Sequence, residues 1–443
     1  MQTQSLPFGK QVAYAFGMMG WSVMINLINV ILVYLYLPPE SSGFPRLITQ
    51  TAIFVIFNAV ALITSSGRLI DAFYDPFIAQ YSDSSKNPKG RRIPLMKLAI
   101  IPSFLFCFFV FYPFHNYESG TNVVWLIFML IGFYVSSTTY IIPYNALLPE
   151  LAPTSTEKVR LATFQSVGYV VGIGIASNAF NLTKVFQDAF GMSRIEGLQC
   201  TVFALGLLAM VFMAITVFAI DEKKYCNKLH VAVPMKLALK QALSNRQFQF
   251  FIVADFSYFI AVTIITSGLM YFVTVLVGLK EEIGNTLMIT MVLVSFLFYP
   301  MVNYLSARIG KKIITIFSFL LLAVVFLGIY FLGKGTISPE VQIYSLIAVA
   351  AIPMASLNIL PNAILAEIIE KDNQETGTSK EGMYFAVRYF FVKIAQTFGM
   401  ALFAMFLLYG KEQGNDFGVR LNGVLGFVLC LLAAGVFSRF KEK

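Results

Sequence analysis

Three ionisable residues lie at helical spacing inside one long apolar stretch of the chain. In SSGRLIDAFYDPFIAQYSD, Arg68 precedes Asp71 by three residues, and Asp71 precedes Asp75 by four. Residues at these spacings share one face of a helix. Two carboxylates one turn apart repel each other unless a cation or a proton lies between them, and Arg68 offsets only one charge. The pattern predicts a metal-cation or proton site (Na⁺, Li⁺ or H⁺) at Asp71 and Asp75, with a structural ion pair to Arg68 as the alternative.

Two further charges lie deep in apolar stretches. Lys393, in GMYFAVRYFFVKIAQTFG, lies ~18 Å from Glu381 by helical rise, which is the depth expected of Asp71. A lysine at that depth is costly without an acid opposite it, so we expect it to pair with the acids. Asp255, in FIVADFSYF, has no evident partner and either contacts a substrate or caps a helix. Arg388 is either a functional group or an anchor at the membrane surface.

Uncharged polar residues in other apolar stretches can complete such a site. Thr138 and Asn145 lie in STTYIIPYNALLPEL, where the prolines free backbone carbonyls beside a lined cavity. Ser22 and Asn26 give the first stretch a polar side. Each asparagine taken singly is more often a helix–helix hydrogen bond than a ligand.

The stretches that carry these residues are long enough to cross a membrane, which needs about 20 apolar residues each. Hydrophobic residues make up 58% of the 443 residues and charged residues only 12%, whereas a soluble domain is roughly a quarter charged. The chain is therefore expected to be an all-α polytopic membrane protein, and its net charge of +9 bears on orientation rather than on nucleic acid. The twelve expected transmembrane helices cover roughly residues 12–37, 47–81, 93–114, 121–148, 160–183, 199–220, 246–277, 284–306, 312–332, 340–369, 382–409 and 418–438.

The basic residues orient these spans. Most Lys and Arg residues fall in turns on the side that also holds both termini, which the positive-inside rule makes cytoplasmic. The MQTQSLPFGK start lacks the apolar core of a signal peptide, so the first span is expected to be retained. A polar linker, residues 221–247, separates an N-terminal six-helix bundle (1–220) from a C-terminal one (248–443). Within it, PMKLALKQAL either lies along the membrane surface or is solvated.

The two halves contain matching turns. YSDSSKNPKGRR follows the second span and YLSARIGKK follows the eighth, and each ends in a glycine followed by two basic residues. Matching features in two six-span halves indicate an internal repeat, as in major facilitator transporters. The glycine permits a tight turn, and the cations can interact with carbonyl-rich helix ends in the other half. Ordinary basic residues flanking a span are the alternative.

These motifs together resemble the glycoside–pentoside–hexuronide:cation symporter family. The likeness covers nearly the whole chain, through YAFGMMG, GRLIDAFYDP with its GRR turn, IPYNALLP, EKVRLATF and FFVK. It implies the major facilitator fold. It also implies that Asp71 and Asp75 coordinate the coupling cation with help from Thr138, and that Lys393 lies between the cation and sugar sites.

The sugar half of the resemblance is less complete than the cation half. Family members bind sugar hydroxyls with one acid in the first span and another in the fourth, where this chain has Ser22 and Ile141. Gln165 stands where the family has an arginine in the fifth span. The resemblance extends to a vertebrate sodium-coupled lysolipid symporter, which makes an amphiphile the alternative substrate. The candidate substrate contacts are Ser22, Asn26, Asn145, Gln165, Asp255 and Lys393.

These observations predict a cation-coupled secondary active symporter that moves a sugar, glycoside or hexuronate by alternating access. The coupling ion is expected to be Na⁺ or H⁺, with no cofactor. The expected partners are a small-molecule substrate and the lipid bilayer, for a monomer in a bacterial inner membrane. A channel would need rings of like charge. An enzyme would need a nucleophile with a base or a metal cluster, and the 2 His and 4 Cys residues show no such spacing.

Overall fold

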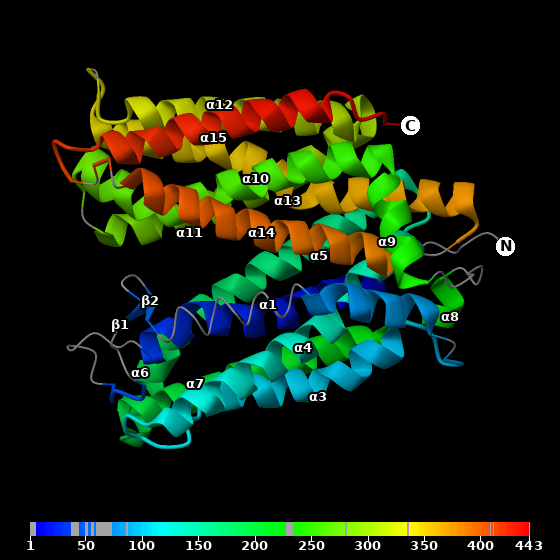
Figure 1. Cartoon of the computed structure of the whole chain (residues 1–443), viewed down its shortest axis with the longest axis horizontal. Coiled ribbons are helices and arrows are strands. Elements are labelled where there is room, and N and C mark those ends of the chain that lie inside the picture. The colour runs from blue at the N-terminus through cyan, green and yellow to red at the C-terminus, as the bar shows by residue number, and fades with distance from the viewer. Residues whose placement is uncertain are drawn as a thin grey trace. The chain divides into compact units, whose positions relative to one another are not determined.

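The structure is a computed structural model in which long helices dominate (Figure 1). Arg68 and Asp71, two of the three residues of the predicted cation cluster, lie outside the part of the chain that it describes. The described residues are 6–36, 44–48, 52–54, 57–58, 73–85, 87–226, 234–279, 281–334, 336–378, 380–407, 409–410 and 412–442.

The helices follow the order of the predicted spans. Among the described residues, ten helical segments are long and apolar enough to cross a membrane. Helix α11 and a helix over residues 73–84 take the places of the predicted eighth and second spans. The named helices are α1 (Phe8–Tyr36), α3 (Ile93–Val110), α4 (Gly120–Leu151), α5 (Ser155–Ser177), α6 (Ala179–Phe190), α7 (Arg194–Ala219), α8 (Glu222–Tyr225), α9 (Met235–Ser244), α10 (Arg246–Tyr271) with its π-helical continuation η2 (Phe272–Val277), α11 (Glu281–Ile309), α12 (Lys311–Phe331), α13 (Pro339–Thr376), α14 (Glu381–Leu407) and α15 (Phe417–Phe437).

Helix boundaries follow local chemistry. Ser119, Ser193 and Asn245 cap α4, α7 and α10, because each side chain accepts a backbone N–H of the first turn. Gly191 ends α6 in the left-handed conformation at a φ of +63°, which favours glycine. Helix α6 was not predicted and lies between the fifth and sixth spans.

Part of the predicted second span is not helical. The strands β1 (Ala52–Phe54) and β2 (Phe57–Asn58) pair in antiparallel fashion, so the prediction of a continuous helix over 47–81 is wrong for these residues. Ile53, Phe54 and Phe57 are β-branched or aromatic, and such side chains favour strands over helices. Apolar content alone therefore overestimated the helix.

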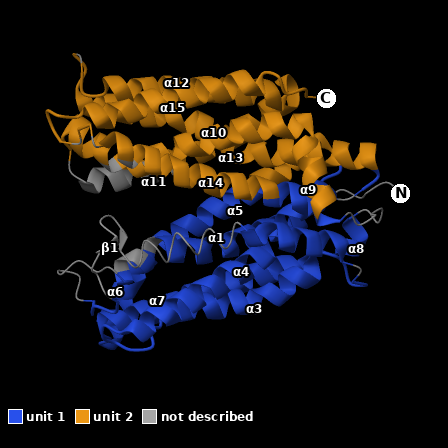
Figure 2. Ribbon diagram, viewed as in Figure 1, with its two compact units in different colours: residues 1–153, 164–235, 377–386 blue, residues 154–163, 236–376, 387–443 orange. Residues whose placement is uncertain are grey.

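The chain divides into two compact units (Figure 2). Unit 1 comprises residues 1–153, 164–235 and 377–386, and unit 2 comprises 154–163, 236–376 and 387–443. Compared with the predicted halves, two short segments are exchanged. The start of α5 belongs to unit 2, and the start of α14 belongs to unit 1.

Close helix packing builds the core of unit 1. Helix α1 touches α7 because Gly20 has no side chain: a Cβ there would lie 2.4 Å from the Ala209 carbonyl oxygen. Helix α1 is fixed to α4 by Tyr14 and Tyr144, whose stacked rings have centroids 4.3 Å apart. Each tyrosine hydroxyl donates to the other residue's carbonyl, at 3.1 and 2.7 Å. Small residues and satisfied polar groups are what membrane helices use at their contacts.

In unit 2, α12 and α15 pack in the same close manner. A Cβ at Gly426 would lie 2.1 Å from the Phe326 ring. Arg420, near the start of α15, donates to the carbonyls of Tyr330 and Leu332 at 2.7 and 2.8 Å, and it pairs with Asp416 at 2.7 Å. The guanidinium therefore satisfies the otherwise unpaired carbonyls at the end of α12.

Candidate cation site and buried charge networks

Asp75 is the described acid of the predicted cation site. It lies on the helix over residues 73–84, and it is 1% exposed. Thr138 of α4 is 3% exposed, and its hydroxyl donates to Asp75 Oδ1 across 3.4 Å. The structure thus brings together two of the three predicted cation ligands within unit 1. A buried carboxylate beside a hydroxyl is an oxygen donor set that suits a hard cation or a proton.

The third predicted ligand, Asp71, lies outside the described residues, as does Arg68. Among the residues that the structure does describe, no cluster of three or more His, Cys, Asp or Glu side chains could hold a metal ion. The two-carboxylate site therefore stays a prediction from the sequence.

The predicted substrate contacts of unit 1 differ in accessibility. Asn145 is 0% exposed and Gln165 is 2% exposed, and the Gln165 side-chain amide donates to Asn145 Oδ1. Ser22 is also fully buried, and its hydroxyl donates to the Tyr169 carbonyl at 2.6 Å. Asn26 alone of these four is partly exposed. The main role of buried amides and hydroxyls that hydrogen-bond to each other is to hold helices together.

Asp255 has a partner that the sequence did not reveal. In unit 2, Arg388 donates two hydrogen bonds to its carboxylate, from Nε at 2.8 Å and from Nη2 at 3.1 Å. Asp255 is 4% exposed and Arg388 is 5% exposed. Arg388 also donates to Asn362 and lies over the Phe251 ring at 5.4 Å. Two buried charges that form a bidentate pair satisfy each other, and this links α10, α13 and α14.

Lys393 lies on α14 and is partly exposed. It follows Arg388 by five residues, so the bidentate pair fixes the helix that carries the lysine. Its predicted pairing with Asp71 concerns a residue outside the described part of the chain and stays a prediction.

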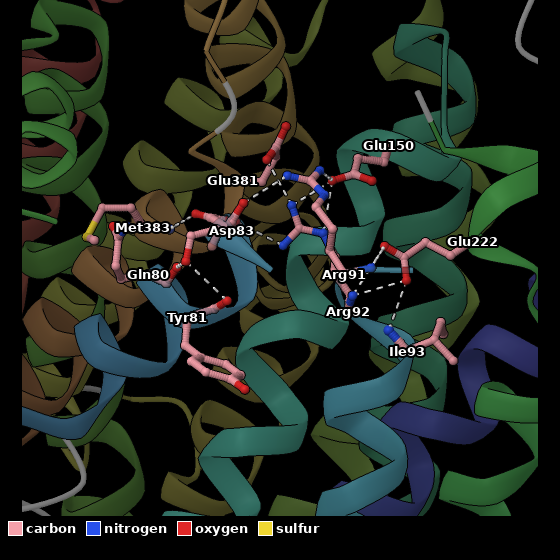
Figure 3. Close-up of polar contacts among 12 residues, drawn as sticks. Gln80, Tyr81, Asp83, Arg91, Arg92, Ile93, Glu150, Glu222, Glu381 and Met383 are labelled. Atoms are coloured by element: carbon pink, nitrogen blue, oxygen red, sulfur yellow. Dashed lines mark hydrogen bonds and ion pairs between the residues drawn. The ribbon is translucent and has the colours of Figure 1, made fainter. Parts of the chain in front are cut away.

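A fully buried arginine organises one end of unit 1, which we call the turn end because it holds the Gly90–Arg92 turn (Figure 3). Arg92 is 0% exposed and contacts three carboxylates: Glu150 at 2.6 Å, Glu381 at 2.8 Å and Asp83 at 3.2 Å. Arg91 joins the same network through Glu150 at 2.8 Å. Glu381 belongs to the α14 segment within unit 1. Such a charge is tolerated in the interior only because its partners surround it.

Asp83 holds the start of α14 through backbone groups as well. Its two carboxylate oxygens accept the N–H groups of Gly382 and Met383 at 3.1 and 3.2 Å. These are unpaired donors of the first helical turn, which attract negative charge. Figure 3 shows Asp83 between Met383 and Arg92.

Glu222 performs a similar role at the start of α3. Its carboxylate accepts the backbone N–H groups of Arg91 at 2.7 Å, Arg92 at 3.0 Å and Ile93 at 3.0 Å (Figure 3). Gly90 makes room for it: the φ there is +120°, and a Cβ would lie 2.2 Å from Glu222 Oε2. The glycine of the predicted turn is therefore required by both conformation and space.

Burial changes the protonation of Asp83, one acid in the network around Arg92. Burial raises the pKa of Asp83 from 3.8 to about 6; Arg92 opposes this shift and Glu381 adds to it. Burial alone would lower the pKa of Arg92, but Glu150, Asp83 and Glu381 together hold it well above its usual value. The guanidinium is thus permanently charged, while one carboxylate in the network can gain a proton near neutral pH.

Unit 2 has a corresponding network at its own turn. Glu442 accepts the backbone N–H groups of Lys311 at 2.6 Å and Lys312 at 2.9 Å, beside Gly310 at a φ of +87°. The Lys311 ammonium pairs with Glu367 at 2.8 Å and donates to Ser155. Ser155 lies in the α5 segment that belongs to unit 2.

The same α5 segment makes further contacts in unit 2. Lys158 is 1% exposed and forms an ion pair with Glu370. The Asn303 side-chain amide donates a hydrogen bond to the Thr163 hydroxyl at 2.9 Å. Each unit therefore holds a short segment at the start of a helix whose remainder belongs to the other unit.

Equal spacing relates the two networks. The carboxylate of Glu222 lies 131 residues after Arg91, and that of Glu442 lies 131 residues after Lys311. Asp83 and Asn303 each stand seven residues before their turn glycine. Glu222 and Glu442 each belong to the same unit as the turn whose N–H groups they accept. Sequence reasoning missed Glu222 and Glu442, although their matched spacing was a signal that could have revealed them.

Comparisons with known proteins identify the kind of molecule. A family model described as MFS/sugar transport protein matches residues 13–437. The chain belongs to this family. An uncharacterized symporter of Synechocystis is 21% identical, with 96% of this chain and 88% of that protein covered. The isoprimeverose transporter of Lactiplantibacillus pentosus is 21% identical, with 93% and 82% covered.

Solved structures agree on the fold. A bacterial homologue of the iron transporter ferroportin, in an outward-facing state, superposes with a TM-score of 0.71 at 12% identity and covers 97% of this chain and 99% of its own. The predicted all-α major facilitator fold is therefore confirmed. The family model and the symporter relatives confirm the resemblance to the glycoside–pentoside–hexuronide:cation symporters. The chain is an integral multi-pass membrane transporter rather than an enzyme.

Proposed function

We propose that this transporter couples the movement of a sugar or glycoside to a cation, Na⁺ or H⁺, that binds at Asp75. The observation that carries this proposal is the burial of the Asp75 carboxylate beside the Thr138 hydroxyl. A buried carboxylate is costly unless a cation or proton neutralises it. Family membership supplies the context of transport, and relatives such as the isoprimeverose transporter support a sugar as the substrate.

Asp71 would complete the cation site from the preceding helical turn, and Lys393 would respond to its occupancy from α14. Binding of the cation lowers the cost of withdrawing the site from water. A site that is charged and empty would stay hydrated and open to one side, so the loaded transporter would close more readily than the empty one. This differential stabilisation of two conformations is what coupling requires.

The networks around Arg92 in unit 1 and Lys311 in unit 2 would take part in the alternating access cycle. Each network holds the start of a helix, residues 377–386 in unit 1 and 154–163 in unit 2. A change of state in unit 1 would require Asp83 to release Gly382 and Met383. The matching step in unit 2 would release the α5 segment from Lys311 and Glu370. The abundance of basic residues supports a cytoplasmic location for these turns and for both termini.

Uptake into proteoliposomes tests this proposal. Wild-type chain is expected to accumulate a neutral sugar or glycoside against its gradient when a Na⁺ or proton gradient is imposed, across a panel that also contains uronates and lysolipids. Asp75→Asn should abolish accumulation while leaving the protein folded. Asp188→Asn, at an exposed position on α6, is the matched control and should leave uptake unchanged.

Thr138 offers a finer test. Thr138→Ala should weaken the apparent cation affinity several-fold, on the order of the ~1 kcal/mol of one hydrogen bond, and Thr138→Ser should restore it. Cation-driven accumulation at the wild-type level in Asp75→Asn would contradict the proposed site. Preferential uptake of lysolipids would identify the alternative substrate class.

A further inference from the structure

The short helix α9 (Met235–Ser244) lies at the level of the membrane surface. It directly precedes the membrane helix α10, and only Asn245, whose side chain caps α10, separates the two. Helix α10 is long and apolar enough to cross a membrane from Arg246 onward. Figure 1 shows α9 running across the end of α10. A helix that crosses the end of a membrane-spanning helix runs along the membrane surface rather than into it.

Two alanines fix how α9 is rotated. Ala238 is 3% exposed and Ala242 is 0% exposed, so this side of the helix rests on the protein. Gln241 and Ser244 line a cavity of about 430 Å³, whose other walls are the start of α10, the end of α13 and residues 440–442. The remaining face of α9 is therefore turned away from the protein, and we call it the outward face.

Leucine and lysine side chains share the outward face. Leu237 is 46% exposed and Leu243 is 41% exposed, and Lys236 and Lys240 are exposed as well. At about 100° per residue, the four side chains fall within an arc of about 120°, with the lysines between the leucines. Exposed leucines gain stability when they are removed from water. On helices at a membrane surface, such leucines enter the acyl boundary while the lysine ammonium groups reach the lipid phosphates.

The outward face carries a positive charge that its own helix does not neutralise. Residues 234–247 contain Lys236, Lys240 and Arg246 but no acid. Within the part of the chain that the structure describes, neither lysine forms an ion pair. Arg246 is exposed and lies over the Phe250 ring at 5.7 Å. Three cations next to the start of a membrane helix attract anionic groups of the adjacent leaflet.

The acids near α9 lie on its cavity side. Four of them line the cavity: Glu367, Asp372, Glu375 and Glu442. Lys311 pairs with Glu367 at 2.8 Å and with Glu442 at 3.8 Å, and Lys371 lies 3.8 Å from Glu375. Asp372 is only 7% exposed. These carboxylates therefore leave the outward lysines available to groups outside the protein.

We infer that the outward face of α9 binds anionic phospholipids of the adjacent membrane leaflet. Leu237 and Leu243 enter the acyl boundary, and Lys236, Lys240 and Arg246 bind the lipid phosphates. The positive-inside rule assigns this leaflet to the cytoplasmic side, where anionic lipids attract basic segments. This lipid contact does not depend on the coupling ion or on the transported substrate.

A fluorescent label locates the outward face relative to the lipid. The two partly exposed cysteines, Cys200 and Cys226, are first replaced by serine, and the other two cysteines are buried. Bimane on Leu237→Cys, in the full chain in lipid nanodiscs, should be quenched by lipids that carry a nitroxide near the headgroup and be protected from iodide. The same label on Gln241→Cys, on the cavity side, is the matched control and should be quenched less by the nitroxide lipid.

The same label identifies the class of lipid. Nitroxide-labelled phosphatidylglycerol should quench bimane at residue 237 at a lower mole fraction than nitroxide-labelled phosphatidylcholine does. Lys236→Gln and Lys240→Gln should each weaken the apparent affinity for phosphatidylglycerol roughly fivefold, as expected for one basic residue near an anionic surface. Lys334→Gln, at an exposed position beyond the end of α12, should leave it unchanged. Thermal unfolding in detergent checks that each variant is folded.

Two results would overturn the inference. Quenching at residue 237 by iodide and not by nitroxide lipid would show that α9 is solvated. Equal quenching by labelled phosphatidylglycerol and phosphatidylcholine would show that the leucines contact lipid without selection for an anionic headgroup. Either result would leave the proposed cation-coupled transport intact, because uptake is measured separately.

Discussion

Replacing Glu222 by glutamine tests how the turn end of unit 1 is built. Helix α3 begins at Ile93 without a side-chain cap from its own N-cap residue, Arg92. Glu222 supplies the cap from elsewhere in the chain, by accepting three N–H groups at 2.7, 3.0 and 3.0 Å. The carboxylate is 6% exposed, so water is a poor substitute for it.

The expected loss follows from two contributions. Glutamine keeps one acceptor oxygen and places an N–H₂ group where the second oxygen accepted hydrogen bonds. Loss of a cap costs about 1 kcal/mol, and loss of the negative charge at a partly buried helix N-terminus costs about 1–2 kcal/mol. Glu222→Gln should therefore lower the free energy of unfolding by about 2–3 kcal/mol.

Thermal unfolding of purified protein in detergent measures this loss. Glu442→Gln is the counterpart in unit 2, where the carboxylate accepts two N–H groups, and a somewhat smaller loss is expected. Glu375→Gln is the matched control, because Glu375 is 64% exposed and forms only a long, exposed ion pair with Lys371, at 3.8 Å. Its effect on the free energy of unfolding should therefore stay within about 0.5 kcal/mol. If Glu222→Gln is no more destabilising than Glu375→Gln, the capping argument is refuted.

Two further predictions concern the buried charges. Arg388→Met should lower the free energy of unfolding by about 3–5 kcal/mol, because it leaves Asp255 buried without its bidentate partner. Adding Asp255→Asn should recover part of this loss in unfolding experiments. Equal stability of the single and double variants would contradict the prediction. The raised pKa of Asp83 means that the folded chain binds its proton more tightly than the unfolded chain does, so the contribution of this group to stability is full below pH 3.8 and declines as the pH rises to about 6. Asp83→Asn should remove that decline. If the difference in unfolding midpoint between Asp83→Asn and wild type is constant from pH 3.8 to about 6, the reasoning is wrong.

The sequence was sufficient for features that depend on local composition. Apolar length predicts membrane helices because every backbone group in hydrocarbon must be paired within its own segment. The strands Ala52–Phe54 and Phe57–Asn58 were missed because they lie within an apolar stretch, and helix α6 was missed because it mixes polar with apolar residues and is too short to cross a membrane. The glycines at 90 and 310 could be identified because a basic turn repeated at the same place in both halves.

The candidate sites were predictable only in part. Asp75 was identified from its helical spacing and Thr138 as a polar residue in an apolar stretch, the resemblance to a family joined them in one site, and the structure places them in contact. Asp255 and Arg388 were each recognised as unusual, but their pairing joins residues 133 positions apart. Nothing in the spacing of two such residues along the chain specifies that they meet.

Residue types and helical spacing thus determined that this protein spans a membrane, which charges it buries, and where its turns lie. The tertiary structure decided which partner each charge has, because a buried ion is satisfied by whatever group the helix packing brings within about 3 Å. It also decided that the side chains of Asn145 and Gln165 hydrogen-bond to each other. Which side chains are buried depends on how each helix is rotated against its neighbours. The glycines that set this rotation act through contacts between helices that are far apart in the chain.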